Sequence, residues 1–320
     1  MADTELFEHT PVLLRETLEA LSPRDGGRYL DGTLGLGGHS SAILAAADCE
    51  LCGIDRDKRA LAIAAERLAP YGERARLFHA RYSDFADCLG RLGWEQVDGV
   101  LLDIGVSSMQ LDDDARGFSF NGDARLDMRM DRDFAGPSAW DLVNKWDVSR
   151  LRECIATLGE EPQAARIARA IVEARARASI DTTAELAALV EKAYPASWRA
   201  KARRHPATRT FQALRMTVND ELGELERLLS GILSWLPCGG RLAVITFHSL
   251  EDRMVKQAMR HWAEGCRCPA HLPACVCHHQ PEVRLLNKKP IRAEQGELAA
   301  NHRASSAKLR AVEKIAEASQ

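Results

Sequence analysis

The chain has 320 residues, 46% of them hydrophobic, and its formal net charge at pH 7 is −3. This length allows one large domain or two ordinary ones, and the charge argues against a protein that coats nucleic acid indiscriminately. No apolar run is long enough to cross a bilayer, and residues 1–7 are too acidic for a signal peptide. We therefore expect a cytoplasmic protein whose nine cysteines stay reduced rather than forming a disulfide scaffold.

The first predicted element is a helix over residues 10–21, with Thr10 and Pro11 at its start. Residues 28–55 follow as a short strand, a glycine-rich turn, a helix and a second strand that ends in Asp55. Glycines let the backbone approach a ligand, and the helix N-terminus offers that ligand its N–H groups. In open α/β sheets, an acid at the end of the next strand accepts hydrogen bonds from a ribose. The stretch predicts a nucleoside-cofactor site.

The turn departs from the dinucleotide-binding sequence G-x-G-x-x-G, because Ser40 stands where a third glycine or an alanine belongs. Asp31 directly precedes the glycines. Its carboxylate would repel a pyrophosphate but attract the cationic amino-acid end of S-adenosylmethionine. S-Adenosylmethionine is therefore the predicted cofactor. In the alternative interpretation, Asp31 only caps a turn of ordinary glycines.

Strands and helices alternate as far as residue 103. The predicted helices are 58–68 and 85–92, and the predicted strands are 75–80 and 97–103. This alternation is typical of a doubly wound parallel sheet, which binds its ligands at the carboxyl ends of the strands. Asp31, Asp55 and Asp103 all fall at such ends.

About a hundred residues without a strand pattern then interrupt the sheet. We expect an acidic loop to residue 133, helices over 138–146, 149–158 and 160–178, and a fourth helix from Thr182, where Thr-Thr-Ala-Glu is a capping box. One long amphipathic helix follows, with apolar residues at steps of three and four from Phe211 to Leu236. Residues 241–247 form a strand, and 282–286 with 307–312 are expected to finish the sheet as a hairpin.

Asp103, at the end of the fourth strand, is the candidate catalytic residue. If the reaction is methyl transfer to the exocyclic amine of a base, that amine is a poor nucleophile because its lone pair is conjugated with the ring. A carboxylate that accepts its N–H bonds makes that lone pair more available. Cofactor binding and capping of the following turn are the alternative roles.

Residues 247–253 follow the fifth strand. His248, Ser249 and Asp252 are too close in sequence to form a hydrolase triad. We interpret Ser249 as the cap of the next helix, with Asp252 in its first turn. His248 either lines the site or is a packed, hydrogen-bonded histidine.

Basic residues cluster in two blocks. Residues 195–215 carry six lysines and arginines without an acid, and residues 283–310 carry seven against Glu294 and Glu297. Such blocks fit contacts with RNA phosphates, although solvated faces are equally compatible with them.

A loop rich in cysteine and proline lies between the fifth strand and the last two. Its zinc-type ligands are Cys266, Cys268, His271, Cys275, Cys277, His278 and His279. The C-x-C spacing differs from the usual C-x₂₋₄-C of zinc sites. We therefore assign no metal, and zinc binding by this loop stays open.

Six sequence blocks occur in order along the chain. They are DGTLGLGGH (31–39), LDIGVSSMQLDD (102–113), RGFSF (116–120), LDMRMD (126–131), HPATRTFQA (205–213) and TFHSLEDR (246–253). Together they resemble the family of bacterial 16S rRNA cytosine-N4 methyltransferases. The resemblance runs from about His9 to Lys314, which is nearly the whole chain.

The resemblance implies a class I S-adenosylmethionine-dependent methyltransferase fold, an α/β fold with a Rossmann-like sheet and an inserted all-helical domain. Residues 1–112 and 207–320 would form the methyltransferase domain, and 113–206 the helical substrate-recognition domain. The implied acceptor is N4 of a cytidine in the decoding region of 16S rRNA within the small ribosomal subunit. The implied cofactor contacts are Gly37, Gly38, His39, Asp55, Tyr82, Asp103 and Gln110.

Two departures from the family pattern are visible. Tyr82 stands where phenylalanine is usual, and it should still stack on adenine. His302 and Ser305 replace a usual proline and arginine, which weakens any rRNA contact assigned to that segment.

Three other functions are alternatives to this one. A methyltransferase with a protein or small-molecule acceptor is not excluded by the sheet alone. A nicotinamide dehydrogenase is disfavoured by Ser40 and Asp31. A non-catalytic rRNA-binding assembly factor would lose nothing on Asp103→Ala. The oligomeric state stays open, and a homodimer is compatible with the sequence.

Overall fold

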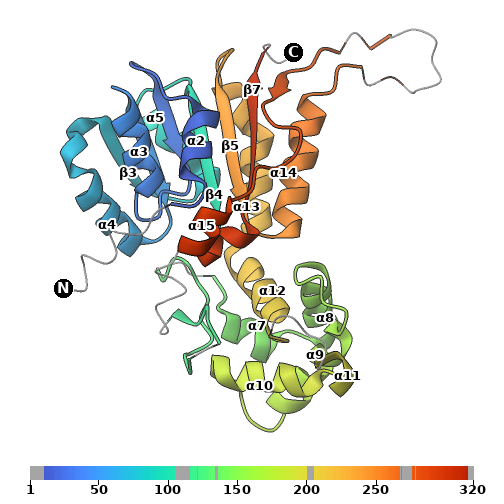
Figure 1. Cartoon of the computed structure of the whole chain (residues 1–320). Coiled ribbons are helices and arrows are strands. Elements are labelled where there is room, and N and C mark those ends of the chain that lie inside the picture. Colours follow the sequence, from blue (N-terminus) through green and yellow to red (C-terminus); the bar gives the residue numbers. More distant parts are fainter. Residues whose placement is uncertain are drawn as a thin grey trace. The chain divides into compact units, whose positions relative to one another are not determined.

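The computed structural model describes residues 11–105, 116–120, 122–133, 136–199, 205–266, 268, 276–277 and 279–315. The chain divides into two compact units (Figure 1). One comprises Met1–Gly105 and Gly223–Gln320, and the other comprises Val106–Leu222. The first unit contains the sheet and is called the sheet unit here; the second is mainly helical and is called the helical unit. Among the described helices, none is long and apolar enough to cross a membrane.

Seven strands form one sheet in the order β3-β2-β1-β4-β5-β7-β6. They are β1 (Arg28–Asp31), β2 (Glu50–Asp55), β3 (Ala75–His79), β4 (Gly99–Ile104), β5 (Arg241–Thr246), β6 (Val283–Leu285) and β7 (Lys308–Lys314). Neighbours among β1 to β5 pair in parallel, and β7 pairs antiparallel with both β5 and β6. This arrangement confirms the predicted class I methyltransferase sheet. The last two strands pair as expected, but residues 286–307, with α15 (Gln295–Ala300), separate them, so they form no tight hairpin.

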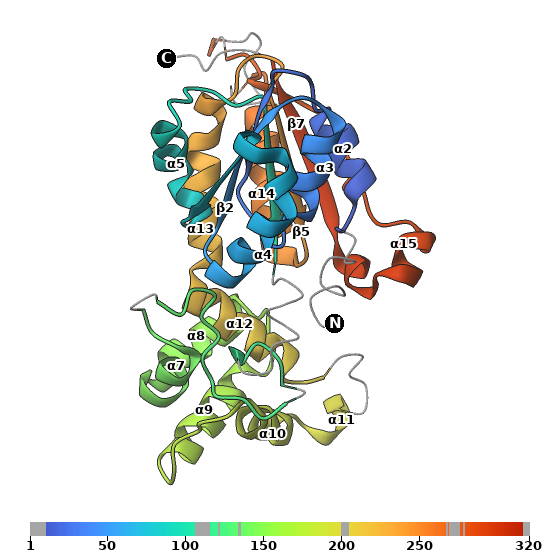
Figure 2. The ribbon, with the colours of Figure 1, turned by 90° about the vertical axis from the view of Figure 1, so that its left-hand side faces the viewer.

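Helices cover both faces of this sheet (Figure 2). The helices α2 (Leu14–Leu21), α3 (Gly38–Ala46) and α4 (Lys58–Leu68) pack on one face, and α5 (Phe85–Arg91), α13 (Glu221–Gly231) and α14 (Ser249–Trp262) pack on the other. Successive strand side chains point to opposite faces. Leu30 and Leu102 therefore enter the core with α13, whereas Tyr29 and Leu101 enter the core with α3.

The helical unit has a hydrophobic core of its own. The helices in its described part are α7 (Ala139–Lys145), α8 (Val148–Thr157), α9 (Ala164–Arg175), α10 (Thr183–Ala193), α11 (Ala196–Arg199) and α12 (Thr208–Asn219). Thr182 and Glu185 form the predicted capping box of α10. The predicted helix over 160–178 is shorter in the structure, because Glu160 has a φ of +46° and α9 begins only at Ala164.

Two of the sequence blocks pack onto this helical core ahead of α7. The buried Arg116 side chain donates to the carbonyl of Met130 (2.8 Å). The backbone N–H of Met130 in turn donates to the side-chain oxygen of Asn219 (2.8 Å). Gly117 has a φ of +73°, and a Cβ there would lie 2.4 Å from the carbonyl oxygen of Arg125. Only glycine fits this position without moving the backbone.

The single long helix predicted from Phe211 to Leu236 is wrong. The segment forms two helices, α12 and α13, which Asp220 separates with a φ of +51°. The apolar residues of the predicted stripe enter two different cores: Phe211 packs in the helical unit, and Leu225 packs in the sheet unit. The spacing of apolar residues predicts a helical face, but it does not indicate which core each residue enters.

Two predicted helix starts also differ. The first helix begins at Leu14, because Leu13 has a φ of +53° and residues 11–13 pack over the start of α3 instead. The cap of α14 is His248 and not Ser249: the N–H of Glu251 donates to the His248 ring (3.5 Å). Asp252 lies in the first turn, as predicted.

Candidate active site

The carboxyl ends of three strands bring the predicted acids to one edge of the sheet. Asp31 ends β1, Asp55 ends β2, and Asp103 is the next-to-last residue of β4. Because β1 lies between β2 and β4 in a parallel sheet, these ends are adjacent. The glycine-rich turn leaves β1 at the same edge and leads into α3.

Two predicted cofactor-contact glycines have structural reasons of their own. Gly37 has a φ of +76°, which favours glycine, and its N–H donates to the carbonyl of Leu34 (2.8 Å). A Cβ at Gly38 would lie 2.5 Å from the Cγ atom of Pro11. The turn is therefore closed on itself at Gly37 and covered by the N-terminal segment at Gly38.

Asp55 holds the turn against β2. One carboxylate oxygen accepts the N–H of Gly35 (2.7 Å), and the other accepts the N–H of Asp57 (2.8 Å). Burial raises the pKa of Asp55, and the two N–H donors oppose this rise. A carboxylate has about four lone-pair sites, so Asp55 keeps acceptor capacity for ribose hydroxyls.

Asp31 supports the turn from the interior. It is 1% exposed, and its carboxylate accepts the hydroxyl of Ser40 (2.6 Å) and the N–H of Thr33 (3.1 Å). Burial raises its pKa to about 6. These two hydrogen bonds give Asp31 the capping role of the alternative interpretation, and its interaction with the cationic end of a cofactor stays a prediction.

Asp103 presents a buried acceptor toward the same edge. Its N–H donates to the hydroxyl oxygen of Thr33 (2.6 Å), which anchors it beside the turn. Its Oδ1 atom is buried, and no donor among the described residues reaches it. Its side chain as a whole keeps about 25% of its surface. Burial, followed by the negative charge of Asp31, raises the pKa of Asp103 to about 7.

His39 lies next to Asp103 and is electrically neutral. Its Nε2 atom is 3.0 Å from the carbonyl oxygen of Val12, which can only accept, so the ring proton is on Nε2. Its Nδ1 atom lies 3.8 Å from Asp103 Oδ2. Burial lowers the pKa of His39 to about 4, so this ring does not compensate the charge of Asp103. The edge therefore favours a cationic ligand.

Tyr82 reaches the same edge from the neighbouring strand. It opens the short helix η2 (Tyr82–Asp84) soon after β3, which pairs with β2. A Cβ at Gly32 would lie 3.2 Å from Tyr82 Cβ, so Tyr82 packs against the start of the glycine-rich turn. The predicted contact Gln110 lies outside the described residues.

Glu224 is a buried acid that sequence reasoning did not single out. This residue of α13 is fully buried, and its carboxylate forms ion pairs with Arg56 (3.4 Å), Arg81 (3.0 Å) and Arg227 (3.1 Å). It also accepts the N–H of Ser83 (3.3 Å). A glutamate in an amphipathic helix gives no local signal of such a role.

Two of the arginines that pair with Glu224 are adjacent in sequence to predicted cofactor contacts. Arg56 directly follows Asp55, and Arg81 directly precedes Tyr82. One carboxylate thus connects the segments that carry two of the predicted cofactor contacts, Asp55 and Tyr82. Through these ion pairs, Glu224 connects α13 to the segments that follow β2 and β3.

His248 is a packed, hydrogen-bonded residue, one of its two predicted interpretations. Its ring accepts the capping hydrogen bond of α14, and its backbone N–H donates to Glu251 Oε2 (3.4 Å). Asp252 forms ion pairs with two residues of β7, Lys308 (3.1 Å) and Arg310 (2.7 Å). These groups organise the turn after β5.

Ion pairs neutralise part of each predicted basic block. Arg284 pairs with Glu313 (2.8 Å), and Lys308 and Arg310 pair with Asp252. In the first block, Arg215 pairs with Glu221 (2.8 Å), and residues 200–204 lie outside the described residues. The exposed cations of the second block include Lys288, Lys289 and Arg292.

Comparison with known proteins gives consistent matches over nearly the whole chain. Residues 6–315 match the model of the MraW methylase family. The chain is 72% identical to the ribosomal RNA small subunit methyltransferase H of Desulfovibrio desulfuricans, over 99% of this chain and 98% of that protein. Proteins of the same name are 65% identical in Nitratidesulfovibrio vulgaris (98% of each chain) and 56% identical in Lawsonia intracellularis (96% of this chain, 99% of that one).

Proposed function

Since this chain belongs to the MraW methylase family, we propose that it transfers the methyl group of S-adenosylmethionine to N4 of a cytidine in the decoding region of 16S rRNA. The observation that carries the proposal is the meeting of the glycine-rich turn, Asp55, Tyr82 and Asp103 at one edge of the sheet. The identity to rRNA methyltransferases over the full chain supports the acceptor.

The groups at this edge fit S-adenosylmethionine. Asp55 has lone pairs left for ribose hydroxyls, and Tyr82 offers an aromatic ring for the adenine. Asp103 has a buried oxygen that lacks a donor among the described residues, beside a neutral histidine. Burying such an acceptor unpaired is costly, and a cationic donor relieves that cost. When bound, S-adenosylmethionine supplies a positively charged sulfonium with an activated methyl group.

The proposed cofactor contacts are Gly37, Gly38, His39, Asp55, Tyr82, Asp103 and Gln110. Within this set the structure supports a division of labour. Gly37 and Gly38 shape the turn and the start of α3, and His39 keeps the charge of Asp103 uncompensated. Asp55 and Asp103 are the acceptors that face a ligand.

The chain's contribution to the reaction is alignment. Methyl transfer requires the amine nitrogen, the methyl carbon and the sulfur to lie in line in a site that excludes water. The target base has to leave its stack to reach the edge that carries Asp103. If Asp103 also accepts an N–H of the target amine, Asp103→Asn lowers kcat beyond what weaker cofactor binding explains.

We assign the contact with rRNA phosphates to the exposed cations Lys288, Lys289 and Arg292. Lysine and arginine bind phosphates by releasing condensed counterions, so that this contribution depends on salt. The proposed substrate is 16S rRNA within the small ribosomal subunit, which implies a cytoplasmic location.

The deciding experiment supplies labelled S-adenosylmethionine and small ribosomal subunits from cells that lack the activity. Nucleoside analysis is expected to find N4-methylated cytidine in 16S rRNA. Asp103→Asn should abolish most of the transfer, whereas Asp87→Asn, at an exposed position of α5, should leave it unchanged. Absence of incorporation into subunits and free rRNA, with cofactor binding intact, would overturn the acceptor assignment.

A further inference from the structure

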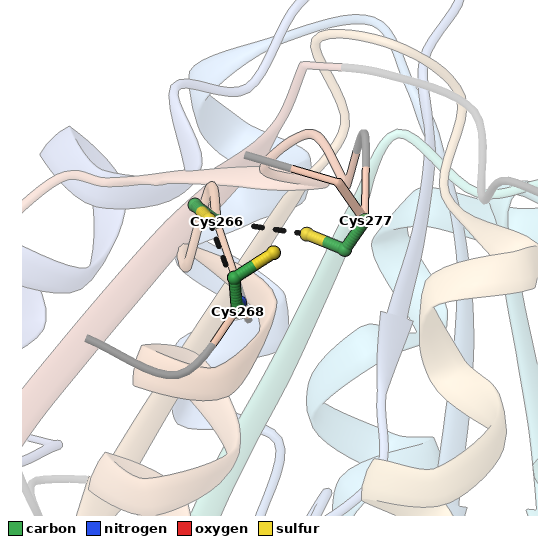
Figure 3. Close-up of side chains that lie close together, drawn as sticks. All are labelled: Cys266, Cys268 and Cys277. Atoms are coloured by element: carbon green, nitrogen blue, oxygen red, sulfur yellow. Dashed lines mark hydrogen bonds between the residues drawn. The ribbon is translucent and has the colours of Figure 1, made fainter. Parts of the chain in front are cut away.

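Three cysteine side chains converge in the loop between α14 and β6 (Figure 3). The sulfur atoms of Cys266, Cys268 and Cys277 all lie within 4.8 Å of one another. Cys266 and Cys277 have a sulfur–sulfur distance of 3.9 Å, well beyond the roughly 2 Å of a disulfide bond. Two thiolates bound to one zinc ion at about 2.3 Å in tetrahedral geometry lie about 3.8 Å apart. The spacing fits shared coordination of a metal ion.

Backbone N–H groups support the sulfur atoms. The N–H of Cys268 donates to Cys266 Sγ (3.4 Å), and the N–H of Val276 donates to Cys268 Sγ (3.3 Å). Hydrogen bonds to the charged form of a group favour that form, and the thiolate is the form that binds metals. Such outer contacts also orient metal ligands. The second bond links the segment of Cys277 to that of Cys268, although they are far apart in the loop.

The loop is closed at its base and lies away from the candidate active site. The N–H of Glu282 donates to the carbonyl of Trp262 (2.8 Å), which joins the end of α14 to the start of β6. Val283 pairs with Lys314, next to the residue that pairs with Arg241, the first residue of β5. The loop therefore emerges at the amino ends of β5 and β6, opposite the edge that carries Asp103. A metal there has a structural role rather than a catalytic one.

We propose that Cys266, Cys268 and Cys277 bind a structural Zn²⁺ ion that clips this loop. Thiolate ligands at tetrahedral spacing select zinc over the hard cations magnesium and calcium, which take oxygen ligands. The ion would join the two arms of the loop, and its binding free energy would add to the stability of the folded chain. Structural zinc is four-coordinate, so the proposed site requires one ligand besides these three cysteines.

The test uses the full chain, produced with zinc in the medium and purified without chelators. Elemental analysis is expected to find about one zinc per chain in the wild type. The double variant Cys266→Ser/Cys277→Ser should hold less than about 0.1 zinc per chain. The matched control is Cys238→Ser, which removes an exposed cysteine of the same unit outside the cluster and should keep its zinc.

Two measurements on the wild type test the proposal even if the double variant folds poorly. On the wild type, a mercurial thiol reagent should release the zinc to a colorimetric indicator. Cobalt substitution should give the intense absorption of tetrahedral cobalt thiolate, whose charge-transfer intensity counts the thiolates. Binding of S-adenosylmethionine by the double variant should stay within about twofold of wild type, because the loop lies at the opposite edge.

Three results would overturn the proposal. One is a wild-type chain without zinc after growth in zinc. Another is a double variant that holds as much zinc as Cys238→Ser. The third is a disulfide between Cys266 and Cys277 in protein purified anaerobically.

Discussion

The Asp103 carboxyl is held where its ionised form is costly. It is buried near Asp31 and Glu251, and the ring of His39 beside it is neutral. A cationic ligand reverses this cost because it favours the ionised carboxylate. Ionisation of Asp103 should therefore strengthen the binding of a cationic ligand and reduce the stability of the free chain.

Binding of S-adenosylmethionine should weaken as the pH falls through about 7. Asp103 is ionised above its pKa of about 7, and only the ionised form attracts a cation. We expect the Kd at pH 6 to be about tenfold higher than at pH 8, measured by calorimetry at constant ionic strength. Asp103→Asn should bind more weakly at every pH and lose this dependence. An unchanged pH profile in the variant would assign the titration to another group.

Asp103→Asn should stabilise the free chain at pH 8. The folded-state pKa is raised above the ordinary 3.8, so ionisation disfavours the folded state, and stability falls as the pH rises from about 4 to 7. Removing the charge should add on the order of 1–2 kcal/mol to the free energy of unfolding. Urea denaturation at pH 8 and pH 4.5 measures this, and the gain should shrink at the lower pH. The exposed control Asp87→Asn should change stability by less than about 0.5 kcal/mol. A loss of stability at pH 8 contradicts the electrostatic argument.

At the scale of elements, α13 connects to the two segments that follow β2 and β3. Glu224 makes this connection through Arg56 and Arg81, and the segments carry Asp55 and Tyr82. The elements themselves form through their apolar faces. Their ends are placed by this buried carboxylate.

Glu224→Gln should therefore reduce both stability and cofactor affinity. Removing one member of a buried ion pair costs about 3–5 kcal/mol. Glutamine lacks the charge but keeps the volume and one acceptor oxygen, so we expect a cost of about 2–4 kcal/mol. Chemical denaturation and calorimetry with S-adenosylmethionine give the two values. Glu226→Gln, at an exposed position of the same helix, is the matched control. A stable variant with weakened cofactor binding would still indicate positioning, whereas wild-type values for both would refute the role.

At the scale of the whole molecule, the net charge does not indicate where exposed cations could contact RNA. The net charge of the chain is −3. In the second basic block, Arg284 forms an ion pair with Glu313, and Lys308 and Arg310 form ion pairs with Asp252. Exposed cations remain at Lys288, Lys289 and Arg292. Binding to RNA should depend on these and not on the paired arginine of the same block.

The triple variant Lys288→Gln/Lys289→Gln/Arg292→Gln should weaken binding to small-subunit rRNA with little change in cofactor affinity. If all three contact phosphates, the slope of log K against log salt should fall in magnitude by about 2–3. Fluorescence anisotropy over a salt series measures this slope. Arg284→Gln, which removes a cation paired with Glu313, should leave it nearly unchanged. Equal slopes for wild type and triple variant would place the RNA contact elsewhere.

The sequence by itself determined the class of sheet and the edge at which its site lies. The signals for these features lie in residues that are close together in the sequence, so they can be recognised without knowledge of the fold. They are the alternating strand and helix patterns, the strand-end acids such as Asp55, and the capping box of Thr182. The strand-end acids and the glycine-rich turn also predicted the cofactor, and the resemblance in six ordered blocks added the activity and the candidate contacts.

The tertiary structure decided what depends on residues far apart in the chain. It broke the stripe from Phe211 to Leu236 at Asp220, because its two halves enter different cores. It buried Asp31 inside the turn, assigned the cap of α14 to His248, and surrounded Glu224 with arginines from three segments. Local propensity and periodicity describe how each segment prefers to fold, whereas burial and long-range pairing arise only when the segments pack together.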